Sequence, residues 1–221
     1  MKLDKSLVES IKSNGIVKIT LDIGEAIIDS NLEDGILKDI PFIGSIINLN
    51  KGFLSIQDRI FSKKMISFLY QLRDIPEDKR INAIQKIEDS KEERIKAGEK
   101  IIYLIDKADD HIKAEFIGIL FSEYVSENLS YEEFKKCSEI INKTYLDDLK
   151  WFLKSDYVRL TMEEASDLIP SGLFDMPYTI TIENAESRYN DSPYVIEGYN
   201  KVEINPYAEK MRLFLKNRIV T

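Results

Sequence analysis

Residues that build disulfides and soft metal sites are almost absent from this chain. Its 221 residues include one cysteine, Cys137, and one histidine, His111. One cysteine cannot close a disulfide within the chain, and this pair leaves little material for a zinc cluster or a Cys/His dyad. We therefore expect no disulfide scaffold, no cofactor, no metal site and no catalytic residue.

Long apolar runs are missing as well. Charges recur every few positions in the first fifteen residues, which argues against the apolar centre of a secretory signal. The longest stretch without a charged side chain, Ile40–Asn50, has eleven residues, whereas a membrane-spanning helix needs about 20. It predicts a buried core helix, with an interfacial or re-entrant segment as the alternative. The expected location is a reducing cytoplasm.

Positive charge is in deficit. The chain has 31 Lys and Arg against 39 Asp and Glu, a formal net charge of −8, so no general basic field attracts nucleic acid. Fingerprints of phosphate-binding loops, dinucleotide folds, zinc proteases and serine hydrolases are also missing. We therefore expect a protein without enzymatic activity. An apolar share of 43% with 32% charged residues supplies a core and a wet surface, which excludes general disorder.

Helical spacing of apolar residues dominates from Leu3 to Tyr145. We predict a mainly α fold: a helical bundle over residues 1–129, followed by a small winged-helix-like α+β region with a β-hairpin over 130–221, packed on the bundle. A helix is expected over 18–32, and Pro41 suits the first turn of the helix that holds the apolar run. Further predicted buried positions are Met65, Phe68, Leu69, Leu72, Ile81, Ile84 and Ile87.

Two features mark the second half of the bundle. The run 116–125 is apolar almost all round, which predicts a central helix with Gly118 at a close crossing. Ser130–Glu133 is a capping box. The helix that it starts is predicted to turn Phe134, Cys137, Ile141 and Tyr145 inward, with Cys137 as a small core residue.

The pattern changes near residue 154. A second capping box, Thr161–Glu164, predicts a short helix that Pro170, Ser171 and Gly172 end. Residues 178–182 and 201–204 alternate as strands do, and we expect them to form a hairpin around a polar loop over 184–193. Asn205-Pro206 then caps a final helix with Tyr207, Met211, Phe214 and Leu215 on one face.

This order of elements resembles a winged helix over roughly residues 131–218. In DNA-binding members a recognition helix enters the groove, but here that helix would display Glu163, Glu164 and Asp167, which repel phosphates. A winged helix used for protein contacts fits this charge better. Residues that could instead assemble a local anion site are Arg188, Lys201, Lys210, Arg212, Lys216 and Arg218.

Carboxylates flank the histidine only at Asp109-Asp110-His111. The three would converge on a metal ion in a loop or helix start, but an aspartate that caps the following helix explains the same residues. The adjacent acids Asp147-Asp148, Glu92-Glu93 and Glu132-Glu133 lack the unlike environments that acid/base catalysis needs.

The segment GILKDIPFIGSII at 35–47, with DRIFSKK at 58–64 and Phe68-Leu69, resembles a group of small uncharacterised bacterial, phage or mobile-element proteins. The group has no established activity. Four functions remain open, and one of them is an enzyme of an unfamiliar type, which missing fingerprints do not exclude. The first of the other three is a regulatory protein that binds a protein partner or itself. The second is an effector that meets membranes through residues 36–60 beside Lys63 and Lys64, in stress or phage defence. The third is a winged-helix DNA regulator. No small-molecule ligand is evident.

Overall fold

The computed structural model describes residues 2–18, 40–49, 55–90, 95–176, 182–184, 194–196 and 201–218. These residues form a mainly helical fold with small antiparallel sheets. The α-helices are α1 (Leu3–Lys12), α4 (Pro41–Leu49), α5 (Ile56–Tyr70), α6 (Glu77–Glu88), α7 (Ala97–Lys107), α8 (His111–Val125), α9 (Tyr131–Lys143), α10 (Leu146–Lys154) and α11 (Pro206–Leu215). The short 3₁₀ helices are η1 (Asn14–Lys18) and η2 (Lys216–Arg218).

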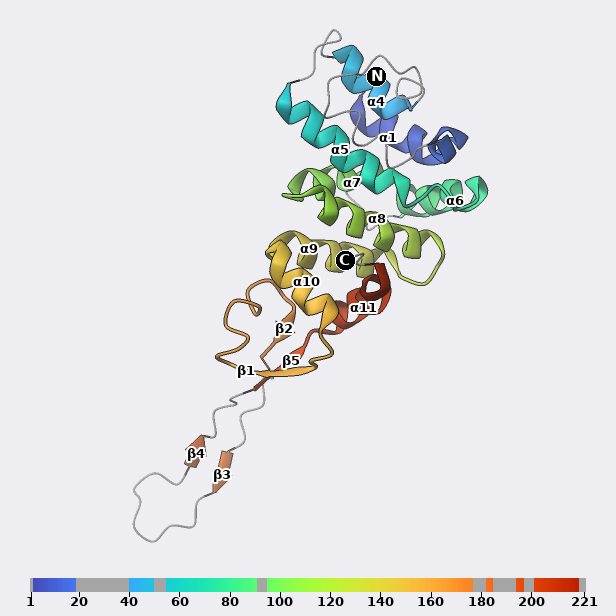
Figure 1. Ribbon diagram of the computed structural model, residues 1–221. Helices are drawn as coiled ribbons and strands as arrows, with labels where there is room; N and C mark the ends of the chain where they lie inside the picture. Colours follow the sequence, from blue (N-terminus) through green and yellow to red (C-terminus); the bar gives the residue numbers. More distant parts are fainter. Residues whose placement is uncertain are drawn as a thin grey trace.

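The helices stack in layers that follow the chain (Figure 1). At one end α1 packs on α4, and below them α5 and α7 lie on α8. Next comes α9, which packs on α8 and α11. One continuous core cluster runs through the stack from Leu7 to Leu215. Both α9 and α11 contact α8, while the division into a bundle over 1–129 and a C-terminal region packed on it stays a prediction.

The apolar run near residue 40 is a core helix, as predicted. Pro41 is the first residue of α4, where a missing amide hydrogen costs nothing. Ile40, Phe42 and Ile43 are buried. The buried Ser10 hydroxyl of α1 accepts a hydrogen bond from the Phe42 amide at 2.9 Å, so α1 satisfies one of the free amides of the α4 N-terminus.

At the centre of the stack, α8 buries residues on almost every side, as the sequence predicts. Gly118 lies where α8 crosses α5. A Cβ atom added to Gly118 would lie 2.8 Å from the Phe68 carbonyl oxygen, closer than Cβ atoms approach a backbone. The close crossing predicted at this glycine is confirmed.

Two buried cations bind the carbonyls at helix C-termini, which the sequence did not predict. One of them is Lys64, so it is not available beside the proposed membrane segment as expected. The Arg80 guanidinium, 1% exposed, donates to the Ile11 and Ser13 carbonyls at the end of α1 and to the Ile75 carbonyl. The Lys64 ammonium donates to the Asp106 and Ala108 carbonyls at the end of α7, at 2.8 Å each. Positive charge favours the negative end of a helix.

The predicted buried stripe of α6 is confirmed at Ile84 and Ile87, which are buried, whereas Ile81 is only half-buried.

The N-terminus of α9 follows its local signal, whereas the residue that precedes α10 departs from the prediction. Ser130 and Glu133 form the predicted capping box, and Phe134, Cys137 and Ile141 are buried. The inward prediction for Tyr145 is wrong, because its side chain is 68% exposed. Since α9 ends at Lys143, Tyr145 is the extended N-cap residue of α10 and has left the inward face.

The small sheet orders its strands β1-β5-β2, all antiparallel. These strands are β1 (Arg159–Thr161), β2 (Phe174–Asp175) and β5 (Lys201–Ile204). A separate ladder joins β3 (Ile182–Asn184) to β4 (Tyr194–Ile196), drawn apart from the body in Figure 1. The predicted pairing of 178–182 with 201–204 is wrong for the described residues, since β5 pairs with β1 and β2, and Ile182 pairs with Ile196. Strands this short carry too little alternation to specify a partner.

The predicted short helix after Thr161 is also wrong. Thr161 and Glu164 exchange the bonds of a capping box, but residues 162–172 continue as successive turns. Gly172 adopts a positive φ of 86°, a conformation that suits glycine. By contrast, Asn205 caps α11 as predicted, with Pro206 at its first position.

Several predictions fall outside the described residues. These are the helix over 18–32 apart from Lys18, the strand residues 178–181, the acids Glu92 and Glu93, and the candidate anion ligand Arg188.

Candidate protein-interaction surface

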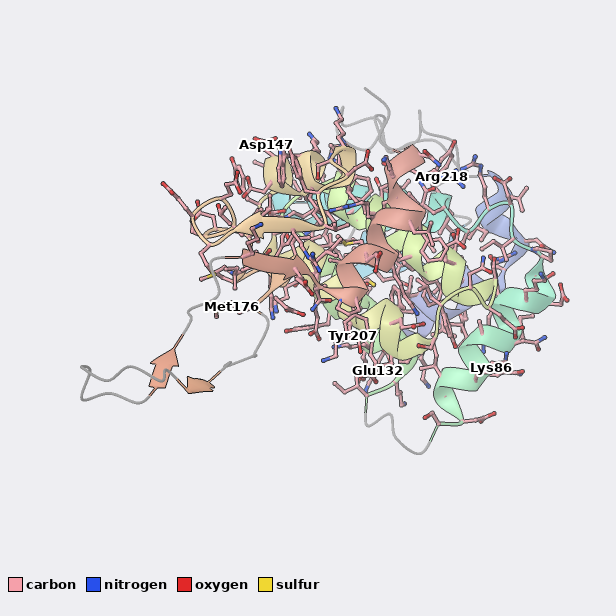
Figure 2. The ribbon with its side chains drawn as sticks, turned by 90° about the horizontal axis from the view of Figure 1, so that it is seen from below. Lys86, Glu132, Asp147, Met176, Tyr207 and Arg218 are labelled. Atoms are coloured by element: carbon pink, nitrogen blue, oxygen red, sulfur yellow. The ribbon has the colours of Figure 1, made fainter. Side chains whose placement is uncertain are left out.

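Exposed apolar side chains concentrate in the C-terminal region. Of the twelve large hydrophobic residues that are exposed in the described part of the chain, seven lie between residues 145 and 213. They are Tyr145, Trp151, Tyr157, Val158, Met162, Met176 and Leu213. Asp147 and Met176 lie at the same end of the molecule, away from Lys86 of α6 (Figure 2). This end of the molecule is therefore the candidate binding surface.

Two aromatic rings of this group stack on each other. The inner face of α10 buries Leu149, Phe152 and Leu153, which leaves Trp151 between them on the outer side. The ring of Tyr157 stacks on Trp151 with centroids 5.9 Å apart and an interplanar angle of 15°. Even so, Trp151 stays 42% exposed and Tyr157 56% exposed. We call the outer side of α10, with Asp147, Asp148, Trp151 and Tyr157, the α10 face.

The neighbouring helix α11 fixes the Tyr157 backbone. The buried Arg212 guanidinium donates to the Tyr157 carbonyl at 2.8 Å and lies 4.1 Å from the centre of the Phe152 ring. Burial lowers the pKa of Arg212. The next residue back, Asp156, forms an ion pair with Lys216, which lowers the pKa of that carboxyl. The aromatic pair is therefore held before any partner arrives, so little ordering entropy is lost on binding.

The candidate anion ligands do not assemble into a site in the described residues. Arg212 is buried against Phe152, and Lys216 is paired with Asp156. Lys210 is paired with Glu133, and this hydrogen bond raises the pKa of Lys210 and lowers that of Glu133. Lys201 is exposed on β5, and Arg218 lies in η2.

The acids expected on the recognition segment do face water. Glu163, Glu164 and Asp167 are all exposed. Glu164 accepts the Thr161 amide and hydroxyl, which lowers the pKa of Glu164. These carboxylates keep this surface acidic, as the sequence predicts, and unfavourable to phosphate.

At Asp109-Asp110-His111 the carboxylates have structural roles. Asp110 caps α8 by accepting the Ile112 amide at 2.7 Å. Asp109 pairs with the buried Lys113 at 2.8 Å. Burial, with the nearby Lys63 charge, lowers the pKa of His111. Within the described residues, no group of three or more His, Cys, Asp or Glu side chains is placed to hold a metal ion.

The start of α5 carries a second exposed apolar face. Ile56 and Ile60 are 77% and 53% exposed. Arg59 and Lys63 follow them by three residues each and therefore lie on the same side of the helix. With His111 and its neighbours they line a groove of about 400 Å³. We call Ile56, Arg59, Ile60 and Lys63 the α5 face. Among the described residues, no helix is long and apolar enough to cross a membrane.

Cys137 lies in the core, as predicted. Its side chain is fully buried and its thiol donates to the Tyr207 carbonyl at 3.3 Å. Burial raises the pKa of this thiol to about 12, so little thiolate exists near neutral pH.

Sequence reasoning missed the aromatic pair, although one signal was present. Leu149, Phe152 and Leu153 follow the i, i+3, i+4 spacing of an inner face, and Trp151 falls outside that stripe. A large aromatic ring on the outer side of a short helix is unusual.

In comparisons with protein-family models, with curated proteins and with solved structures, no match to the chain was found.

Proposed function

We propose that this chain is a non-enzymatic regulatory protein that works in the cytoplasm by binding a protein partner through its α10 face. The observation that carries the proposal is the exposed, stacked pair Trp151–Tyr157. Aromatic rings bury large areas at low entropic cost, and they are enriched at the centres of protein interfaces.

Crosslinking from the surface itself tests this proposal. A photoreactive phenylalanine derivative replaces Tyr157 in the full chain, which is exposed to cell extract from its own organism. Tyr103, also about half exposed at 51%, lies on α7 and gives the matched control position. We expect a discrete crosslinked protein from position 157 and none from position 103. A chain that stays monomeric and crosslinks equally little at both positions contradicts the proposal.

We further propose that residues 131–218 form a winged-helix-like unit used for protein contacts. The order α9, α10, β1, β2, β5, α11 and the antiparallel sheet support it. The turns at 162–172 replace the recognition helix of DNA-binding members, and Glu163 and Asp167 are exposed there. Both features favour a protein over DNA. In a gel-shift titration on random duplex we expect no binding even at low salt, and binding that weakens as salt rises contradicts this assignment.

A second candidate function is contact with anionic membranes through the α5 face. The observation that favours it is the pair of exposed isoleucines beside Arg59 and Lys63, because interfacial helices combine apolar and basic residues in this way. In liposome flotation with anionic lipid, the wild-type chain is expected to float and the Ile56→Glu/Ile60→Glu variant to stay at the bottom. Ile95→Glu is the control, since Ile95 is exposed elsewhere. A wild-type chain that remains at the bottom ends this candidate.

A further inference from the structure

We propose that the partner of the α10 face presents a cationic segment whose arginine stacks on the Trp151–Tyr157 pair and contacts Asp147 and Asp148. This inference rests on the proposed function, because it names the chemistry of the partner that the same face binds.

Two other aromatic rings, the exposed Tyr103 and the half-buried Tyr70, are covered by the chain's own cations, whereas no cation lies over the exposed Tyr145 among the described residues. Arg73 lies 3.6 Å from the centre of the Tyr70 ring. Lys100 and Lys107 lie over the Tyr103 ring at 5.2 and 5.3 Å. Cations are attracted to the negative face of an aromatic ring, most strongly to tryptophan. In the part of the chain that the structure describes, no cation lies over Trp151 or Tyr157. This ring pair is therefore open to a cation from a partner.

Two carboxylates lie on the same side of α10 as the Trp151 ring. Asp147 and Asp148 lie four and three residues before Trp151, so all three share one side of α10. A helical side chain leans toward the N-terminus, which brings the Trp151 side chain toward these two aspartates. Neither carboxylate is held by an ion pair or a side-chain hydrogen bond within the described residues.

The local charge points the same way. Residues 145–176 hold seven acids and three bases, a net charge of −4, which is half of the −8 of the whole chain. Of the three bases, Arg159 is paired with Glu203, and the half-buried Lys150 lies on α10 three residues after Asp147. Lys154 lies one turn after Trp151, at the opposite end of the face from the aspartates. A partner cation is therefore expected at the N-terminal end of α10.

Arginine fits this surface better than lysine. Its planar guanidinium stacks on an aromatic ring and can at the same time pair with a carboxylate through two parallel hydrogen bonds. A lysine ammonium is more strongly hydrated and makes a point contact. Nucleobases also stack on exposed aromatic rings, but the phosphates that accompany them are repelled by Asp147 and Asp148.

Tryptophan fluorescence can report on this site. Trp151 is its one tryptophan, so tryptophan emission of the full chain reports on the α10 face alone. The titrants are blocked peptides of alternating glycine with arginine, lysine or glutamine, each added to the purified chain at low and moderate salt. We expect saturable quenching or a spectral shift with the arginine peptide, weaker binding of the lysine peptide and no response to the glutamine peptide.

Variants in which Trp151 is retained distinguish what the Tyr157 ring, the two aspartates and Lys154 contribute to arginine-peptide binding. Loss of the Tyr157 ring in Tyr157→Leu is expected to weaken arginine-peptide binding about 2- to 5-fold. The Asp147→Asn/Asp148→Asn variant should weaken it by a similar factor and remove most of its salt dependence. Lys154→Gln should strengthen it, since a repelling charge is gone. The control is Glu163→Gln/Asp167→Asn, which removes exposed acids outside the α10 face and should leave binding unchanged.

Any one of the following results overturns the inference. One is a wild-type chain whose emission does not respond to the arginine peptide. Another is an equal response to the glutamine peptide or a stronger response to single-stranded oligonucleotide. The third is emission that shifts with concentration of the chain alone, which assigns the face to a second copy. If Tyr157→Leu fails to fold, the paired aspartate variant still decides. If the peptide fails but position 157 still crosslinks a protein, the proposed function stands and only the partner chemistry is wrong.

Discussion

The buried arginine at the end of α1 offers the sharpest test of how the N-terminal layers hold together. In Arg80→Met the aliphatic stem is retained and the guanidinium is removed. The carbonyls of Ile11, Ser13 and Ile75 then lose a charged donor at once. Because Arg80 is only 1% exposed, water cannot easily replace that donor.

The size of the effect follows from the burial of these carbonyls. A buried acceptor that loses its donor costs about 1 to 3 kcal/mol. The Arg80 bond to Ile11 is buried and those to Ser13 and Ile75 are partly buried, so we expect the free energy of unfolding to fall by about 3 kcal/mol. For a chain of this size the same loss lowers the melting temperature by about 6 to 12 °C.

Urea unfolding followed by circular dichroism measures the difference. Lys79→Met is the matched control, because Lys79 is an exposed neighbour on the same helix, and it should change stability by less than about 0.5 kcal/mol. Equal midpoints for Arg80→Met and Lys79→Met would refute the role assigned to the buried guanidinium.

Three further predictions concern the core. Lys64→Met should lower the free energy of unfolding in urea by about 2 kcal/mol, because the carbonyls at the end of α7 lose their donor. Lys63→Met is the control and should have little effect. Equal effects of the two substitutions would contradict the role assigned to Lys64. Gly98→Ala places a Cβ atom 2.3 Å from the Asp4 carbonyl oxygen, so α1 and α7 must separate at a cost of about 2 kcal/mol, and an unchanged melting temperature speaks against that packing. The Cys137 thiol should resist a disulfide reagent at pH 8 until urea unfolds the chain. Because its pKa is raised from 9.0 to about 12, the folded chain keeps a proton that the unfolded chain loses, and its contribution to stability should be lost as pH rises from about 9 toward 12.

Signals confined to one turn of chain predicted three helix starts, although the capping box at Thr161–Glu164 predicted a helix that does not form. Ser130, Asn205 and Asp110 cap helices with their own side chains, and such caps are specified within a few residues. Gly118 stood out because nothing else in an apolar helix explains a residue without a side chain. The interior position of Cys137 followed from helical spacing alone.

Features that depend on distant parts of the chain could not be predicted. No pattern in the sequence indicates that Arg80 and Lys64 are buried, because the carbonyls that they bind are up to 69 residues away in sequence. The partners of β5 are strands of two and three residues, too short to display a pattern. The exposure of Trp151 could have been predicted from the spacing of Leu149, Phe152 and Leu153. Its stacking on Tyr157 depends on how the chain turns after Ser155.

Crosslinking from position 157 with competition by the arginine peptide tests the central claim most directly. The account predicts a discrete crosslinked protein that fades as peptide is added, with no counterpart at the control position 103. A crosslink that forms equally at both positions, or none at position 157, would contradict the claim that the α10 face binds a protein partner.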